Sequence, residues 1–363
     1  MARIVTLYED QRRPFVPTDM SYVRWYRISA ALAALGHDVD IATREPGLLG
    51  RLDRRSVARL APRLRRVPIA RVRFERYDVV KTLFHRGFET LERHGGANHP
   101  FIIAKLGSVV DSEDRDGVYF YGERRRQLFA VQQRIAARSR IVTVLTAPSR
   151  ERWQRCFGHG AATVLVPGAV DERIPAPGPD PFGDTQSRRC LFAGNIYDSA
   201  SQPEAHATLV AKLNGLGRLL GRRGIRLYFL GPGERQGIDA AQVTALGAVP
   251  YDRSWSFLQH AHAGLVLALG PQPNDNESTK IYHYLRVGLP TVCEAGFPNQ
   301  DLVLEAKLGR VVANGDLAAL AAAVEATMGG AWDRQGAVAF VLARHTWLHR
   351  ARVYDELIRS AGM

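Results

Sequence analysis

The most informative segment of the 363-residue chain is AGLVLALGPQPNDNESTKIYHYLRVGLPTVCEAG, residues 263–296. Its first apolar run, AGLVLAL, predicts a buried strand. A polar loop then leads to a helix that we expect to open at Ser278 or Thr279. Gly288, Leu289 and Pro290 turn the chain into a second apolar run, PTVC. This order predicts a β-α-β unit with parallel strands.

The start of the predicted helix suits a diphosphate. Its first backbone N–H groups and its positive end would face the loop, and Lys280 lies just inside the helix. An ordinary capped helix is the alternative interpretation. Ligands of doubly wound sheets bind outside the carboxyl ends of the strands, so we expect this loop to form part of the functional site.

The same alternation of strands and helices extends in both directions. ARIVTL and SYVRWYRISAALAALGHDVDIAT predict a first β-α-β unit, and residues 166–189 are rich in proline and glycine, as linkers are. We therefore predict an α/β fold of two Rossmann-like doubly wound domains that face a central cleft. Residues 1–170 would form the N-terminal domain, residues 171–343 the C-terminal domain, and residues 344–363 a helix that packs back on the N-terminal domain.

Composition narrows the class of protein. The three cysteines, Cys156, Cys190 and Cys293, lie far apart and form no Cys-x-x-Cys pair, which indicates a reduced, cytoplasmic protein. The N-terminus shows no apolar signal segment, and no apolar run approaches the roughly 20 residues of a membrane span. His345 and His349 are four residues apart, but no third ligand accompanies them, so we expect no metal site.

The net charge of +13 is concentrated in one segment. Residues 44–76 hold eleven arginines and three acids, a local net charge of +8. This segment could be a solvated helical face, a surface that binds anionic lipids or a surface that binds an anionic acceptor molecule. Because leucine, valine and isoleucine alternate with arginine as in interfacial helices, we favour an anionic membrane surface. The aromatic residues are not interleaved with the arginines, so we expect no nucleic-acid partner.

The segment 263–296 resembles the donor-binding half of GT-B glycosyltransferases, especially the bacterial GT4-like group. The nucleotide-sugar loop of that group reads Ser or Pro, one residue, Lys, then Leu-Tyr-Glu-Tyr and a Gly-x-Pro turn, and this chain has STKIYHYLRVGLP. The order of the remaining segments is also similar, including LFAGNIYD, LYFLGPGE and the closing helix. The resemblance implies transfer of a sugar from a nucleotide-diphosphate sugar (UDP-, GDP- or dTDP-linked), with no other cofactor and no metal.

The resemblance also implies which residues contact the nucleotide sugar. The diphosphate and sugar would be lined by Glu277, Ser278, Thr279 and Lys280, and the base would lie near Val249, Pro250 and Tyr251. The remaining donor-binding residues would be Gly194, Asn195, Gly231, Asn276, Tyr282 and His283. His283 occupies the position of the group's ribose-binding Glu, and GNIYDSASQPE lacks the Arg and Lys that retaining members carry. Stereochemistry therefore stays open.

The catalytic residues would be Asp111, Glu277 and Lys280. An inverting reaction needs a base for the acceptor hydroxyl, and Asp111 is the first acid after the predicted strand PFIIAKL. Competing candidates are Glu113, Asp114, Asp116, Glu9, Asp10 and His85. The acceptor, bound by residues 1–170, would be a saccharide, a lipid-linked molecule or a small molecule. The protein would be cytoplasmic or peripheral on the inner face of the membrane. A nucleotide-sugar epimerase and a non-catalytic nucleotide-sugar-binding partner remain as alternatives.

Overall fold

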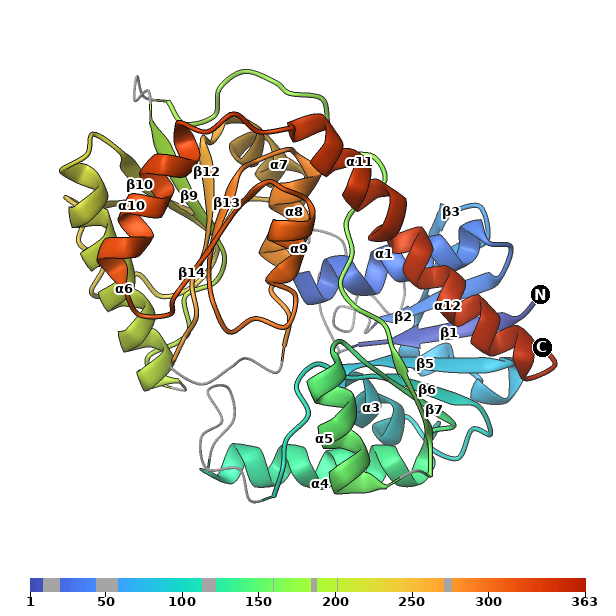
Figure 1. Ribbon diagram of the computed structural model, residues 1–363. Coiled ribbons are helices and arrows are strands. Elements are labelled where there is room, and N and C mark those ends of the chain that lie inside the picture. Colours follow the sequence, from blue (N-terminus) through green and yellow to red (C-terminus); the bar gives the residue numbers. More distant parts are fainter. Residues whose placement is uncertain are drawn as a thin grey trace, which may run out of the picture. The chain divides into compact units, whose positions relative to one another are not determined.

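The computed structural model describes residues 1–8, 20–43, 58–112, 122–158, 160–183, 188–200, 202–270 and 276–363 (Figure 1). The chain forms two compact units. Unit 1 comprises Met1–Pro167 together with Trp347–Met363, and unit 2 comprises Gly168–Thr346.

Unit 1 is built on an eight-stranded sheet in the order β3-β4-β2-β1-β5-β6-β7-β8. All neighbouring strands are parallel except β3 and β4. The strands are β1 Arg3–Leu7, β2 Asp38–Thr43, β3 Ala58–Ala61, β4 Leu64–Pro68, β5 Val79–Leu83, β6 Ile102–Lys105, β7 Ile141–Val144 and β8 Ala162–Leu165. The helices are α1 Met20–Ala34, α3 Phe84–Arg93, α4 Gly122–Arg138, α5 Ala147–Phe157 and α12 Trp347–Ser360, with 3-10 turns η1 Ile69–Arg71 and η2 Phe74–Arg76.

The C-terminal helix α12 belongs to unit 1 and packs beside α1 (Figure 1). Tyr354 of α12 is buried and its hydroxyl lies 3.1 Å from the Thr143 hydroxyl of β7. Asp355 lies 3.0 Å from Nε2 of the buried His37. These polar contacts fix the helix on the sheet in one orientation.

The Arg-rich segment forms no α-helix where the structure describes it. Its residues 58–68 form the antiparallel hairpin β3-β4, so the interfacial helix expected there is wrong; residues 44–57 lie outside the described residues. Arg65 reaches across to β2 and donates to both oxygens of the buried Asp40 at 2.8 Å. Tyr77 donates to the same carboxylate at 2.7 Å. Alternate side chains of a strand face opposite sides, which lets arginine alternate with apolar residues here.

Unit 2 is built on a six-stranded, all-parallel sheet in the order β11-β10-β9-β12-β13-β14. The strands are β9 Arg189–Ala193, β10 Arg226–Leu230, β11 Val243–Gly247, β12 Ala263–Val266, β13 Thr291–Glu294 and β14 Gly309–Val312. The helices are α6 Pro203–Gly221, α7 Tyr251–His260, α8 Thr279–Arg286, α9 Asp301–Glu305, α10 Leu317–Met328 and α11 Arg334–Arg344. The predicted α/β class with a parallel, doubly wound sheet is confirmed in both units.

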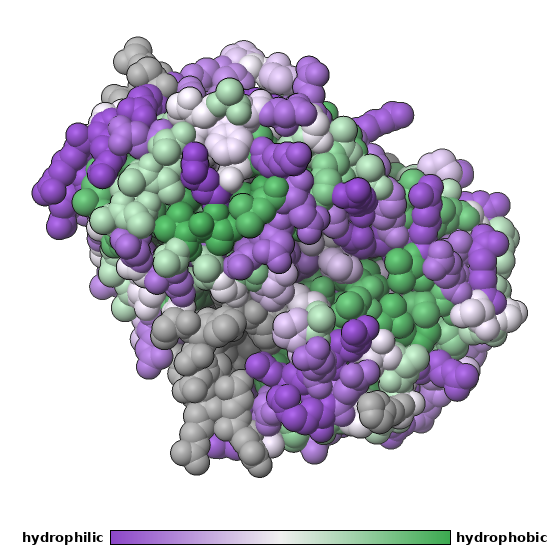
Figure 2. All heavy atoms as spheres, in the orientation of Figure 1, coloured by the Kyte–Doolittle hydropathy of each residue, from purple (hydrophilic) through white to green (hydrophobic). Residues whose placement is uncertain are grey.

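One face of the molecule and the exposed apolar side chains can be described. On the face drawn in Figure 2, hydrophilic residues cover most of the surface and hydrophobic residues gather in separate areas. Among the described residues, the large hydrophobic side chains that are exposed are Met1 and Leu304. No helix in the described part of the chain combines the length and apolar composition that a bilayer crossing requires. Within the same residues, no group of three or more His, Cys, Asp or Glu side chains is placed to hold a metal ion.

Candidate functional site

The sheet of unit 2 opens where the direction of winding reverses, between β9 and β12. These strands pair only at Ala263 with Cys190 and at Gly264 with Leu191. Beyond that point the Tyr284 hydroxyl enters between them: it accepts from the Ala193 N–H at 2.9 Å and lies 3.2 Å from the carbonyls of Leu191 and Leu265. The ring of Tyr284 thereby anchors α8 at the carboxyl edge of the sheet, where doubly wound folds bind ligands.

Two strands at this edge are followed by a glycine, Gly194 after β9 and Gly231 after β10. The Gly194 N–H donates to the Leu230 carbonyl at 2.9 Å, and the Gly231 N–H donates to the Gly247 carbonyl at 3.0 Å. Gly231 has a φ of +151°, and a Cβ built there would lie 1.6 Å from the Gly194 carbonyl oxygen. Only glycine fits at Gly231, and the absence of a Cβ at Gly194 lets the Lys280 side chain lie directly against the main chain.

The side chain of Lys280 lies against the main chain at Gly194. A Cβ on Gly194 would come within 2.5 Å of Lys280 Cε, and the Lys280 ammonium lies 5.0 Å from the centre of the Phe192 ring. Among the described residues, none accepts a hydrogen bond from its Nζ. Burial lowers the pKa of Lys280 to about 8. The site therefore holds a cation that no acid of the described chain neutralises.

Ser278 is the residue at which α8 begins, and Asn299 clamps its main chain. The Ser278 N–H donates to Asn299 Oδ1 at 2.8 Å, and Asn299 Nδ2 donates to the Ser278 carbonyl at 3.0 Å. Ser278 is 5% exposed, and its hydroxyl has no hydrogen-bond partner among the described residues. No side chain caps the first N–H groups of α8. Buried polar groups of this kind are normally satisfied, and an anion at the helix start would satisfy them.

Glu277 and Tyr282 lie beside the helix start. Tyr282 donates to Glu277 Oε2 at 2.8 Å, and both pack against Gly168, where a Cβ would lie 2.5 Å from Glu277 Oε1. Asn276 is half-buried and precedes them, and Thr279 is half-buried at the first position of α8. The structure thus brings together the predicted residues from Asn276 to Lys280, with Gly194 against the Lys280 side chain and Gly231 against Gly194.

His283 and Tyr251 form a buried link between α8 and α7. The His283 Nδ1 donates to the Thr279 carbonyl at 2.7 Å, and Nε2 lies 3.1 Å from the Tyr251 hydroxyl. The imidazole also packs on the Trp255 ring, with centroids 5.1 Å apart. Both ring nitrogens have protein partners, so these contacts give His283 a packing role and do not support its predicted donor contact.

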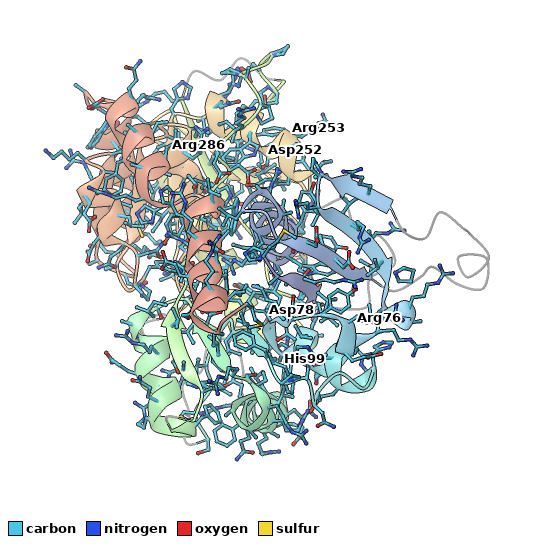
Figure 3. All side chains as sticks on the ribbon, turned by 90° about the vertical axis from the view of Figure 1, so that its right-hand side faces the viewer. Arg76, Asp78, His99, Asp252, Arg253 and Arg286 are labelled. Atoms are coloured by element: carbon cyan, nitrogen blue, oxygen red, sulfur yellow. The ribbon has the colours of Figure 1, made fainter. Side chains whose placement is uncertain are left out.

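Three other predicted donor residues lie nearer the surface. Val249 is half-buried and Pro250 is exposed just before α7, and Asn195 is exposed just after Gly194. Figure 3 shows Asp252 and Arg253 at the start of α7 and Arg286 at the end of α8. Arg286 donates to the carbonyls of Asp171 and Glu172 at 2.9 Å, which fixes the far end of α8.

Asp111 lies in unit 1, after β6, and is held by arginines. Its carboxylate pairs with Arg155 at 3.0 Å, and Arg125 donates to its main-chain carbonyl. A carboxylate in an ion pair is a weaker base than a free one, so a role as base requires release from Arg155. His85 lies in the first turn of α3. The competing acids Glu9, Asp10, Glu113, Asp114 and Asp116 fall outside the described residues.

A buried ion pair that the sequence did not reveal supports the loop before the site. Lys212 of α6 donates to the two oxygens of Glu294 at 2.8 and 2.7 Å, to the Ala268 carbonyl at 2.9 Å and to Asn314 at 2.9 Å. Glu294 is fully buried and also accepts from the Ala268 N–H at 2.7 Å. The partners are between 26 and 102 residues apart in the chain, so no local pattern could have shown them.

Solved structures share this fold over the whole chain. Sucrose-phosphate synthase from Thermosynechococcus elongatus matches with a TM-score of 0.70 at 15% identity, covering 99% of both chains. HepE from Anabaena in complex with UDP and glucose matches with a TM-score of 0.69 at 13% identity, covering 99% of this chain and 100% of that one. AviGT4, a glycosyltransferase of avilamycin A biosynthesis, matches with a TM-score of 0.64 at 19% identity, covering 100% and 99%.

The fold is that of GT-B glycosyltransferases. At these identities the likeness establishes the fold alone. No protein-family model matches the sequence, and no curated protein matches it either.

Proposed function

We propose that the protein is a glycosyltransferase that moves a sugar from a nucleotide-diphosphate sugar to a hydroxyl of a saccharide, lipid-linked or small-molecule acceptor. One observation carries the proposal: Ser278 precedes α8 and Lys280 lies in its first turn, and neither the Ser278 hydroxyl nor the Lys280 ammonium has a hydrogen-bond partner among the described residues. Two similar structures hold such ligands, HepE with UDP and the E. coli trehalose-6-phosphate protein with UDP-2-fluoro glucose.

The proposed mechanism uses these groups on the leaving diphosphate. Negative charge grows on the diphosphate as the bond to the sugar breaks, and preorganised donors stabilise that charge. Lys280, the Ser278 hydroxyl and the first N–H groups of α8 would supply this stabilisation without a metal ion. Glu277, held by Tyr282, would accept from a sugar hydroxyl. Asp111, once released from Arg155, would take the proton of the acceptor hydroxyl if the reaction inverts.

The test is calorimetric titration of the full chain with UDP, GDP and dTDP. We expect one of them to bind, and Lys280→Met to weaken binding by about tenfold to a hundredfold, because a charge-assisted hydrogen bond contributes about 1.5–3 kcal/mol. Lys307→Met is the matched control, since it removes the same charge from an exposed residue of unit 2. If Lys280→Met binds every nucleotide as the parent does, the proposed diphosphate site is wrong.

We also propose that unit 1 contacts an anionic membrane surface from the cytoplasm. Arg59, Arg73 and Arg76 are exposed and have no ion-pair partner among the described residues; Figure 3 shows Arg76. Clustered arginines are attracted to anionic lipids. Flotation with phosphatidylglycerol vesicles at low salt should carry the protein, high salt should release it, and neutral vesicles should not bind it. Failure to float at low salt would contradict the proposal.

A further inference from the structure

An arginine that the proposed mechanism does not use lies at the carboxyl edge of the sheet of unit 2. Arg235 is in the loop after β10, and its guanidinium packs against the main chain at Gly247, the last residue of β11. A Cβ built on Gly247 would lie 2.4 Å from Arg235 Nη2, so the lack of a side chain there makes room for the guanidinium. Doubly wound sheets bind ligands outside this edge, which makes Arg235 a candidate ligand-binding residue.

No residue of the described chain satisfies this guanidinium. Arg235 is exposed, and none of the described residues accepts a hydrogen bond from its side chain or pairs with it. Arg226 of β10 shows the contrast. Its guanidinium donates to the Thr244 hydroxyl at 2.7 Å and to two main-chain carbonyls at 2.7 and 2.9 Å. Within the described chain, the N–H groups of Arg235 are therefore left for water or a ligand.

The loop that carries Arg235 is fixed on the neighbouring loop, which follows β9. A Cβ built on Gly233 would lie 2.1 Å from the carbonyl oxygen of Ile196, so the two main chains are in close contact. The Ser199 N–H donates to Glu234 Oε2 at 2.7 Å, and Glu234 directly precedes Arg235. These contacts hold the main chain of the arginine in place before a ligand arrives, which lowers the entropy cost of binding.

Arg235 and Lys280 contact the ends of two strands that lie on either side of β10. Gly247 of β11 and Ala193 of β9 are in register with the same residue of β10. Neighbouring strands are about 4.8 Å apart, so these two strand ends lie roughly 10 Å apart. Lys280 lies against Gly194, the residue after β9. A nucleoside diphosphate carries its charge at one end and its base at the other, so a diphosphate at Lys280 leaves the base to reach the end of β11.

A guanidinium distinguishes bases by the acceptor atoms that they present. Its parallel N–H groups fit two adjacent acceptors. Guanine offers such a pair in O6 and N7, whereas adenine presents the acceptor N7 beside an amino donor. Thymine offers a single carbonyl at the same edge, and uracil has the same carbonyl. Among these bases, guanine therefore makes the best partner for an arginine.

We propose that Arg235 selects the base of the nucleotide sugar and that this base is guanine. Arg235 donates to O6 and N7 of the base, while Lys280 and Ser278 hold the diphosphate. This inference rests on the proposed function and narrows its donor to a GDP-sugar. The UDP held by two of the similar structures does not decide the base here, because the likeness to them establishes the fold alone.

The test is calorimetric titration of the full chain with GDP, IDP, UDP, dTDP and ADP. We expect GDP to bind about tenfold to a hundredfold more tightly than UDP, dTDP and ADP, because a bidentate arginine contact to guanine discriminates by that order. IDP keeps O6 and N7 and lacks only the amino group of guanine, so it should bind as tightly as GDP. Arg235→Met should abolish the advantage of GDP and leave the affinity for ADP unchanged.

Two controls separate recognition of the base from attraction to the phosphates. Arg222→Met removes another exposed arginine of unit 2, at the end of α6, and should keep the preference for GDP. Inorganic pyrophosphate has no base, so Arg235→Met should bind it as the parent does, whereas Lys280→Met should bind it more weakly. Equal losses of GDP, ADP and pyrophosphate binding in Arg235→Met would place Arg235 on the diphosphate and overturn the inference.

The outcomes also distinguish this inference from the proposed function. If GDP has no advantage in the parent, or if its advantage survives in Arg235→Met, the assignment of the base is overturned. Nucleotide binding that depends on Lys280 but not on the base would leave the proposed function in place and remove only this inference. A parent protein that binds none of the nucleotides would contradict both.

Discussion

The carboxyl edges of the two sheets occupy equivalent topological positions, but different kinds of residues form them. In unit 2, Gly194 and Gly231 follow β9 and β10, and the Lys280 side chain lies directly against the main chain at Gly194. In unit 1, the bulky Tyr8 and Phe84 follow β1 and β5, and Lys81 lies below them in the sheet. The uncapped start of α8 suits a diphosphate, whose oxygens its first N–H groups can meet, whereas side chains give a surface that can be specific for one acceptor.

The largest loss of stability should come from replacing Lys212, the lysine of unit 2 that pairs with Glu294. Lys212→Met leaves the fully buried Glu294 without its cation, and breaking a buried ion pair from one side costs about 3–5 kcal/mol. Urea denaturation should show this loss in the free energy of unfolding. Lys280→Met, which breaks no described ion pair, should cost far less. Equal losses for the two variants would refute the distinction between a structural and a ligand-facing lysine.

A smaller loss of stability should come from replacing Gly231, which follows β10 at the carboxyl edge of the sheet of unit 2. Gly231→Ala places a methyl group against the Gly194 carbonyl at a positive φ, and we expect it to lower the free energy of unfolding by about 1–3 kcal/mol. Gly221→Ala is the control. It lies at the end of α6 with no atom within 4 Å of the new methyl group, and should stabilise by about 0.5–1 kcal/mol. Similar changes in the two variants would show that the edge is not close-packed.

Ser278→Ala should separate stability from binding. The hydroxyl is buried and has no described partner, so its removal should leave the free energy of unfolding unchanged or slightly higher. Removal of a donor to a diphosphate should still weaken nucleotide binding by about tenfold. Denaturation and calorimetry on the same preparation measure both. A variant that is less stable but binds normally would assign Ser278 a purely structural role.

The pH dependence of nucleotide binding should follow Lys280. Its pKa of about 8 in the free protein means that the ammonium form dominates at pH 7 and is lost as the pH rises through 8. Because only the ammonium attracts the diphosphate, affinity should fall by about tenfold between about pH 7 and pH 9. Lys280→Met should flatten this dependence. A parent protein whose affinity rises with pH would contradict the role of Lys280.

Much of the fold was predictable because it depends on local patterns. Short apolar runs separated by helical segments indicated parallel strands, and Ser278 and Thr279 marked the start of α8 as observed. The Arg-rich segment misled because arginine alternating with apolar residues fits a strand as well as an interfacial helix. Arg65 of β4 pairs with Asp40 of β2, which lies 25 residues away in the chain, and no local sequence pattern shows that partner.

The sequence by itself determined the two parallel α/β sheets, the loop before α8 and the place of Lys280 just inside that helix. Only the tertiary structure decided which side chains are satisfied: Asn299 clamps Ser278, Tyr284 fills the opening between β9 and β12, His283 turns toward Tyr251, and Arg155 holds Asp111. The reason is physical. Apolar periodicity and caps act over a few residues, whereas hydrogen bonds in a core join groups that packing brings together from distant parts of the chain.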